Sequence, residues 1–346
     1  MKRSAPPSSG YYPSQNHQPG RTGNGGRKKT RKLRPRWVWL AMMLGCLAVF
    51  ITCAVLLVRY FADIASSKQT SADLRTIYQE AATEEVTQTA VVNATVTAAA
   101  EMLKSSAPST APTGPVPAGN ALAGLWPNQY EGNPHLVVSE QFLNLRDECP
   151  DIVGWLKIDG LLDEPVVQRD NEYYLTHDYL GKKNVTGALF LDENCNLKSV
   201  PVQMVVHGHN MKEGAMFGSL KKYKVKDAAF YKQNAFIEFN TIYENGTYVI
   251  FAVLEADIRS GEPRYFPFWQ YASFAGQEDF DRYITQAKAY SHYRCGVDVR
   301  AGDRLLTLAT CLGSDDNKRL VVMARRVRED EDRVALNAAI LSTSNR

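Results

Sequence analysis

The chain contains near its C-terminus the stretch Thr307-Leu308-Ala309-Thr310-Cys311, an apolar and β-branched run that ends in a cysteine. Eight residues later, Arg319 opens a second such run, Leu320-Val321-Val322-Met323-Ala324. Runs of this kind predict strands, and a short loop between two strands places their facing ends side by side. A cation beside a thiol stabilises the thiolate, and a guanidinium also donates hydrogen bonds to a developing oxyanion. The two runs therefore predict an enzyme whose site pairs a thiol with a guanidinium at one end of a β-sheet.

Six further short runs share this composition and are bounded by Gly, Asn, Asp or Pro. With the two runs above, the predicted strands are residues 166–168, 188–191, 203–206, 236–239, 248–254, 297–299, 305–309 and 320–327. Eight short strands separated by turn residues favour a closed barrel or a sandwich. Apolar residues at helical spacing predict two helices, at 139–149 and 278–290. The predicted fold class is therefore mainly β, with peripheral helices.

Another strand-like run ends in histidines. It reads Val205-Val206-His207-Gly208-His209-Asn210. Histidine is the usual partner of a nucleophilic cysteine, and His209 precedes Cys311 by 102 residues, so only the fold can bring the two together. Alone, a strand-end cysteine is more often a buried structural thiol, and a histidine beside a strand is more often structural or exposed. Together, His209, Cys311 and Arg319 favour catalysis.

The N-terminal part contains a segment long enough to cross a membrane. Residues 37–58 carry no charge over 22 positions, and as a helix they would be about 33 Å long, enough to span the hydrocarbon core. A cleaved signal peptide is the alternative, but its apolar region is normally about 7–15 residues long. The stretch Ala62-Asp63-Ile64-Ala65 is also a poor cleavage site. We therefore expect a single-pass anchor.

Basic residues are concentrated before this segment. The first 36 residues contain ten Lys and Arg and no Asp or Glu. The whole chain has 40 basic and 37 acidic residues, so the remainder carries 30 basic against 37 acidic side chains. Basic residues on the N-terminal side of a span favour a cytoplasmic N-terminus and an extracellular catalytic domain. The arm is then a topology signal beside anionic lipid, and nucleic acid is not an expected partner.

Composition divides the chain into five parts. Gly, Pro and Ser accompany the basic residues of the first part, which cannot form a core, and residues 105–120 form a Pro-rich spacer. The expected parts are a cytoplasmic arm at 1–36, a transmembrane helix at 37–58, an extracellular stalk and linker at 59–130, a catalytic domain at 131–330 and a C-terminal tail at 331–346.

Six cysteines are present, and two of them, Cys46 and Cys53, lie in the predicted span. The other four are Cys149, Cys195, Cys295 and Cys311. The sequence leaves their disulfide state open. No Cys-x-x-Cys pair occurs, so zinc and thioredoxin-like chemistry lack support. We expect no metal and no cofactor.

These motifs, in this order behind an N-terminal anchor, resemble the sortases, which are membrane-anchored cysteine transpeptidases of Gram-positive bacteria. The resemblance rests on Val206-His207-Gly208-His209-Asn210-Met211, on Thr307-Leu308-Ala309-Thr310-Cys311 and on Arg319. It covers residues 140–328, and the class B branch fits best. Other segments similar to that branch are 151–156, 165–168, 171–175 and 187–192, with the long helix before the cysteine strand. The resemblance implies a closed eight-stranded sortase-type barrel.

The resemblance also implies roles for individual residues. Cys311 matches the nucleophile, His209 the catalytic histidine and Arg319 the arginine of the family motif. His207 stands where the family commonly has tyrosine or phenylalanine. Residues implied in substrate binding are Asn171, Leu175, Ala309 and Thr310, with Tyr265 and Phe266 in the loop that covers the groove. Some class B enzymes have an aspartate two residues after the cysteine, but this chain has Gly313 there.

The implied reaction is acyl transfer through a cysteine. The Cys311 thiolate would attack a threonyl carbonyl in the sorting signal of another secreted protein, and an amine would then accept the acyl group. The expected partners are a sorting-signal peptide, of the type Asn-Pro-x-Thr or a related one, and an amine of a peptidoglycan precursor or of a pilin. Two other functions stay open: a secreted cysteine protease, with water as the acceptor, and an inactive membrane-tethered binding protein.

Overall fold

The computed structural model describes residues 36–102, 125–212, 214–224, 228–312 and 315–346. The chain divides into two units, Met1–Val55 and Leu56–Arg346. Three predicted features lie outside the described residues: the cytoplasmic arm up to residue 35, the Pro-rich spacer at 105–120 and Gly313.

The first unit holds the apolar start of α1, a helix that runs over Arg36–Met102. Its large apolar side chains, such as Trp37, Leu44 and Phe50, are each more than half exposed. Exposed apolar residues on all sides of a helix are typical of a membrane span. By length and composition, α1 is a candidate to cross a membrane once, in the region predicted at 37–58.

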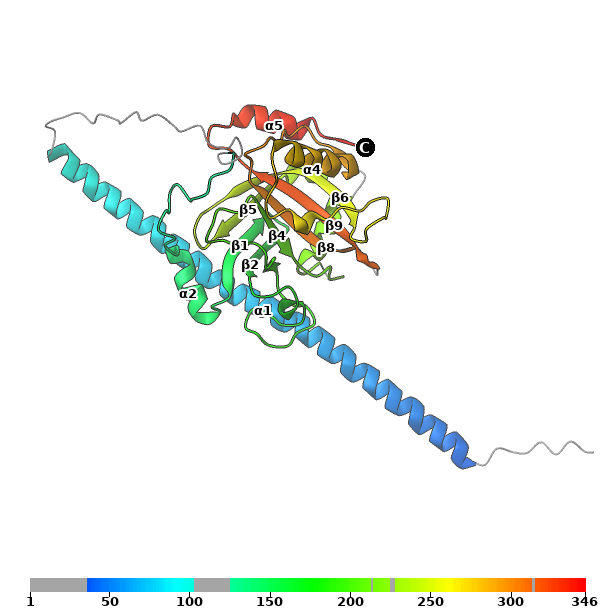
Figure 1. Ribbon diagram of the computed structural model, residues 1–346. Helices are drawn as coiled ribbons and strands as arrows, with labels where there is room; N and C mark the ends of the chain where they lie inside the picture. Colours follow the sequence, from blue (N-terminus) through cyan, green and yellow to red (C-terminus); the bar gives the residue numbers. More distant parts are fainter. Residues whose placement is uncertain (1–35, 103–124, 213, 225–227, 313–314) are drawn as a thin grey trace, which may run out of the picture. The chain divides into compact units, whose positions relative to one another are not determined.

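The second unit contains a closed barrel of eight strands (Figure 1). These are β1 Ile152–Ile158, β2 Leu162–Val167, β3 Phe190–Leu191, β4 Gln203–His207, β5 Phe236–Thr241, β6 Thr247–Asp257, β8 Leu305–Leu312 and β9 Asp315–Arg326. Around the barrel the order is β1-β2-β3-β4-β8-β9-β6-β5, and β5 pairs with β1. The β2–β3 and β4–β8 pairs are parallel. The predicted closed eight-stranded barrel is therefore confirmed.

Helices and short strands surround the barrel. They are α2 Glu140–Glu148, α3 Ala229–Gln233, α4 Gln277–Tyr290, α5 Arg333–Leu341, the 3-10 helices Tyr173–Leu175, Phe217–Lys224 and Phe268–Gln270, and the paired strands β7 Tyr293–Arg294 and β10 Ser344–Asn345. Helix α4 packs on β6 (Figure 1) and buries the stripe of Phe280, Tyr283, Ile284 and Ala287. Strand β6 is consequently buried on both faces over residues 248–254, by the barrel interior and by α4.

The strand predicted at 297–299 is wrong, because this run is not a strand in the structure. Every strand of a closed barrel already has two neighbours, so the run has no free edge to join. Its backbone oxygens accept hydrogen bonds from side chains instead. The Lys288 ammonium donates to the Val297 oxygen at 2.8 Å, and the Arg325 guanidinium donates to the Asp298 oxygen at 2.6 Å.

Strand β1 is the barrel strand that the sequence pattern missed. Its run of apolar residues is interrupted by Gly154, and glycine is unfavourable inside a strand. The structure gives the reason for glycine there. A Cβ at this position would lie 2.7 Å from the Phe239 ring and 2.9 Å from the Asn240 oxygen, so the close approach of β5 requires a residue without a side chain.

Within the second unit, part of α1 packs on the barrel. The buried residues of this part recur three and four positions apart, as expected for one face of a helix. They are Ile64, Ser67, Ser71, Leu74, Tyr78 and Ala81. Tyr78 stacks on Trp155 of β1 with 4.5 Å between the ring centroids, and the Arg75 guanidinium pairs with Asp163 at 3.0 Å. Part of the stretch predicted as a stalk, 59–130, is therefore attached to the barrel.

Candidate active site

The β8–β9 hairpin brings the predicted thiol and guanidinium together. Cys311 on β8 is opposite Arg319 on β9 in the strand register, so the two side chains lie on one face of the sheet. Strand β4 runs parallel to β8 on its other side, with His207 opposite Ala309. Parallel neighbours end at the same edge of a sheet. The loop after β4, which carries His209, therefore leaves the sheet at the edge where Cys311 lies.

A cavity of about 260 Å³ opens at this edge. It is lined by Asn171, Leu175, Phe190, Asp192, His207, Gly208, His209, Ile258, Phe268, Trp269, Ala309, Thr310, Cys311 and Arg319. Seven of the nine predicted site residues are in this set: Cys311, His209, Arg319, Asn171, Leu175, Ala309 and Thr310. The barrel thus gathers residues that are far apart in the sequence around one thiol.

The His209 ring is held by a backbone oxygen. Its Nε2 atom lies 2.7 Å from the Leu175 oxygen. An N–H at Nε2 can donate to that oxygen, which leaves Nδ1 as the proton acceptor. Gly187 makes this approach possible, since its φ of 58° favours glycine and a Cβ there would clash with the Tyr174 oxygen and lie 3.1 Å from Cδ2 of His209. The imidazole is therefore presented to the cavity in one tautomer.

Asn210 links the histidine loop to the cysteine strand. Its side-chain Nδ2 donates to the backbone oxygen of Cys311 at 2.9 Å. The sequence contains Asn210 in the histidine motif, but nothing in the local pattern predicts its partner 101 residues away. This hydrogen bond fixes the two strand ends relative to each other.

The side chain of Thr310 does not point the same way as that of Cys311. Thr310 is buried, and strand alternation points its side chain to the opposite face of β8 from Cys311.

All six cysteines are free thiols. Burial raises the pKa of Cys149 and raises that of Cys195 to about 12, so both are neutral. Among the described residues, no group of three His, Cys, Asp or Glu side chains is placed to hold a metal ion.

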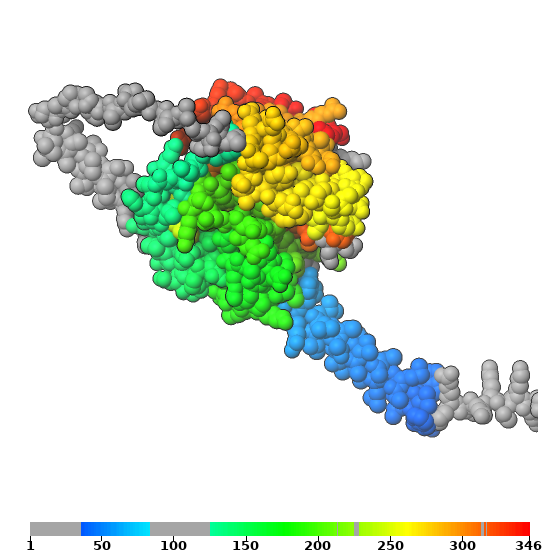
Figure 2. Space-filling view, in the orientation of Figure 1, coloured from blue at the N-terminus to red at the C-terminus, as the bar shows by residue number. Residues whose placement is uncertain are grey.

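The segment between β6 and α4, shown in yellow in Figure 2, contributes different residues from those predicted. Phe266 is buried and stacks on Tyr283 of α4 at 4.9 Å, and neither Phe266 nor Tyr265 lines the cavity. Phe268 and Trp269 line it instead. The sequence shows a cluster of aromatic residues here, but it does not indicate which of them turn toward the groove.

A second histidine lines the same cavity. His207 Nε2 lies 3.0 Å from Oδ2 of Asp192, which is only 3% exposed. Asn171 Nδ2 reaches the same carboxylate oxygen at 3.2 Å. Burial alone would raise the pKa of Asp192, but hydrogen bonds from His207 and Asn194 outweigh burial and lower it. Asp192 is therefore ionised at neutral pH.

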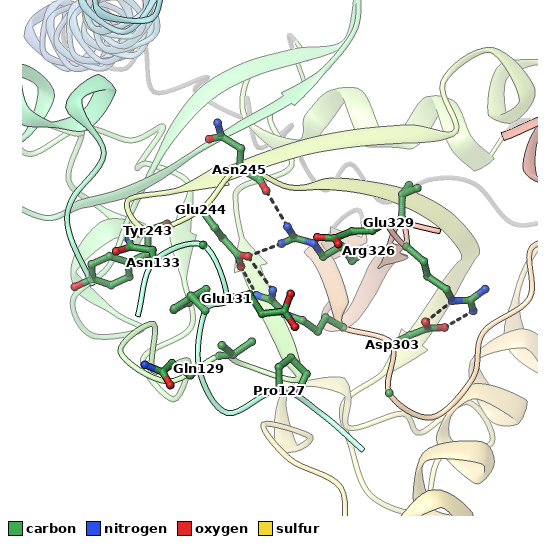
Figure 3. A pocket seen from close by; sticks show the side chains of 17 residues that line it. Pro127, Gln129, Glu131, Asn133, Tyr243, Glu244, Asn245, Asp303, Arg326 and Glu329 are labelled. Carbon is green, nitrogen blue, oxygen red and sulfur yellow. Dashed lines mark hydrogen bonds and ion pairs between the residues drawn. The ribbon is translucent and has the colours of Figure 1, made fainter. Parts of the chain in front are cut away.

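A larger, polar cavity of about 560 Å³ lies at the other end of the barrel, where β8 begins and β9 ends (Figure 3). Its guanidinium groups are already paired with carboxylates. Arg304 and Arg326 both bind the carboxylate of Glu244, and Arg328 binds Asp303 at 2.7 Å. This cavity contains neither a cysteine nor a histidine. The candidate thiol site is therefore the smaller cavity.

The closed β-barrel places a strand-end thiol opposite a guanidinium, and the loop after the adjacent parallel strand adds an imidazole. This arrangement defines a class of cysteine enzymes suited to acyl transfer. A family model for the sortase domain matches residues 156–327. The chain is 32% identical over 194 residues to sortase B of Listeria monocytogenes, which covers 55% of this chain and 75% of that protein. The chain belongs to the sortase family, whose members are cysteine transpeptidases.

Other proteins similar to this chain are also sortases of class B. Sortase B of Staphylococcus aureus is 29% identical over 195 residues, which is 55% of this chain and 76% of that protein. The structure of a Staphylococcus aureus sortase B–substrate complex has a TM-score of 0.50 at 28% identity and covers 56% of this chain and 88% of that one. Sortase B of Bacillus anthracis has a TM-score of 0.53 at 24% identity over 78% of this chain and supports the fold.

Proposed function

We propose that this chain is a membrane-anchored transpeptidase that cleaves a C-terminal sorting signal of a secreted protein at a threonyl carbonyl. It would transfer the protein to an amine of the cell wall or of a pilin. The observation that supports this most strongly is the pairing of Cys311 with Arg319 in one cavity with His209. This set supplies a nucleophile, an oxyanion donor and a proton carrier.

In the first half of the reaction, the Cys311 sulfur attacks the threonyl carbonyl carbon and the carbonyl oxygen takes up negative charge. Arg319 donates hydrogen bonds to that oxygen with its planar fork. The C–N bond then breaks, and His209 as imidazolium gives its proton to the departing amine. The product is a thioester between the sorted protein and Cys311.

In the second half, an acceptor amine attacks the thioester. Neutral His209 takes a proton from the amine, the C–S bond breaks, and the Cys311 thiolate and the His209 imidazolium are restored. A new amide replaces the one that was cleaved, so no external energy source is needed. Water in place of the amine would give hydrolysis, which is the activity of a cysteine protease.

We also propose that residues 37–58 anchor the chain in the membrane with the N-terminus in the cytoplasm and the catalytic domain, 131–330, outside. The exposed apolar surface of α1 supports an anchor, and the ten basic residues before it support the orientation. A sorted protein leaves the cell through the membrane, so an enzyme fixed there meets its substrate as it emerges.

The test is the product formed from a sorting-signal peptide with and without an added primary amine. The proposal expects an amide product that replaces the hydrolysis product as the amine concentration rises, and no product from Cys311→Ala. Hydrolysis that is insensitive to amine would instead assign a protease. A Cys311→Ala variant that keeps its turnover and its melting temperature would remove Cys311 from the mechanism.

A further inference from the structure

The backbone oxygen that holds the His209 ring belongs to Leu175, in the segment that joins β2 to β3. Leu175 is 39% exposed, so burial of its own side chain does not fix the place of that oxygen. A surface segment of this kind keeps one conformation only where other groups tie it down. The position of His209 therefore depends on what secures this segment.

Asn184 secures the segment on both sides of the His209 ring, and it is only 4% exposed. Its backbone N donates to the Thr176 oxygen at 2.9 Å, and its backbone oxygen accepts from the backbone N of Gly187 at 3.2 Å. Thr176 directly follows Leu175 in the chain, and Gly187 lies against the edge of the His209 ring. Asn184 thus joins the two stretches of backbone that contact the imidazole.

The side chain of Asn184 connects this segment to helix α1. Its Nδ2 donates to the backbone oxygen of Asp63 at 3.0 Å, and its oxygen accepts from the backbone N and the hydroxyl of Thr186 at 2.9 and 2.7 Å. A second contact joins the same two elements, since the backbone N of Val185 lies 3.4 Å from Oδ2 of Asp63. The next residue of α1, Ile64, is buried in the core cluster of the barrel, so the helix is fixed at this point.

This link bears on the rate of proton transfer. A buried amide donor without a partner is unfavourable, so the Asn184 side chain keeps the segment and α1 joined. A proton carrier must lie within hydrogen-bond distance of the group that receives the proton, and a displacement of about 1 Å can lower a rate on the order of 100-fold. A shift of the Leu175 oxygen would therefore slow the step that uses His209, without removing any group that binds the peptide.

We propose that Asn184 is a positioning residue for His209, and that it acts by tying the segment that carries the Leu175 oxygen to helix α1. Asp63 follows the stretch proposed as the membrane anchor, 37–58, by five residues. The helix that anchors the chain then also orients the proton carrier. This inference rests on the proposed function, because it assumes that His209 gives a proton to the departing amine.

The experiment compares two acyl donors that share one sorting-signal sequence, on the full chain in detergent. One donor is the amide, whose leaving amine needs a proton from His209, and the other is a p-nitrophenyl ester of the threonyl carboxyl, whose leaving group departs without one. Asn184→Ala should lower kcat/KM for the amide about tenfold through kcat, with KM unchanged, and that for the ester about twofold or less. Asn184→Asp keeps the oxygen that accepts from Thr186 but loses the donor to Asp63, and it should lower the amide-to-ester ratio about as much.

The ratio of two donors on one variant does not depend on how much of that variant is folded. Asn240→Ala is the matched control, because Asn240 also donates to α1, at the Tyr78 hydroxyl, but lies on β5 rather than beside His209. It should leave the ratio unchanged.

A wild-type ratio in Asn184→Ala would overturn the inference while the transpeptidase function stands. A wild-type ratio in Asn184→Asp alone would overturn the part given to α1. A chain that forms no thioester from either donor would contradict the proposed function itself.

Discussion

Replacing Tyr78 by alanine tests whether helix α1 is an integral part of the catalytic domain. The Tyr78 side chain is 9% exposed, and its ring stacks on Trp155 with centroids 4.5 Å apart and planes 5° from parallel. Its hydroxyl accepts a hydrogen bond from Asn240 at 2.9 Å. Truncation of a buried aromatic residue costs about 3–5 kcal/mol. Because Tyr78 lies between helix and barrel rather than in the central core, we expect a loss of about 3 kcal/mol.

The loss can be measured by thermal and urea unfolding of the full chain in detergent. For a domain of this size, about 3 kcal/mol corresponds to a fall in Tm of about 6–12 °C. Glu80→Ala is the matched control, because Glu80 lies on the exposed face of the same helix turn, and it should change stability by about 0.5 kcal/mol or less. Equal Tm values for the two variants would refute the docking of α1 on the barrel.

Three further predictions concern the site and its support. Asn210→Ala removes the hydrogen bond to the Cys311 oxygen and should lower kcat/KM for thioester formation about fivefold, with an unchanged Tm. Arg319→Lys keeps the charge but loses the planar fork, and single-turnover rates should fall about 100-fold. Burial raises the pKa of the Glu164 carboxyl in the folded chain. The folded state is therefore favoured while this carboxyl is protonated, and that contribution to the unfolding free energy is lost as the pH rises through the raised pKa. Glu164→Gln should therefore raise the unfolding free energy more at pH 8 than at pH 4.

Each of these predictions has a clear contrary result. An Asn210→Ala enzyme with the wild-type rate would show that the strand ends are aligned without that bond. Near-full activity of Arg319→Lys would show that charge alone stabilises the oxyanion. A gain in stability from Glu164→Gln that is equal at pH 4 and pH 8 would show that the buried carboxyl does not titrate between them.

The proposed nucleophile, guanidinium and imidazole could be located in the sequence because each marks an abrupt local change. Cys311 ends an apolar run, Arg319 begins one, and His209 follows one within a glycine turn. Most of the strands were predictable for the same reason, since short β-branched runs alternate with turn residues. These runs left a barrel and a sandwich open, and the resemblance to the sortases favoured the barrel. Only the pairing of β4 with β8 was needed to bring the imidazole to the thiol.

The remaining site residues depend on contacts that a linear pattern does not encode. Asn210 acquires its role from a carbonyl on another strand, and Asp192 acquires its role from a histidine on the neighbouring strand. Phe268 and Trp269 line the cavity, whereas Phe266 is buried under α4. These aromatic residues lie within four positions in one loop, so only the backbone path decides which of them face the groove.

In the proposed mechanism, Cys311 carries the sorted protein as a thioester. The most direct measurement is intact mass spectrometry of the full chain after brief exposure to a sorting-signal peptide without amine, followed by acid quenching and peptide mapping. We expect a mass increase equal to the acyl part of the peptide, located on Cys311, removed by hydroxylamine and absent from Cys311→Ala. An adduct on another residue, or cleavage of the peptide with no adduct on Cys311 at any time, would contradict it.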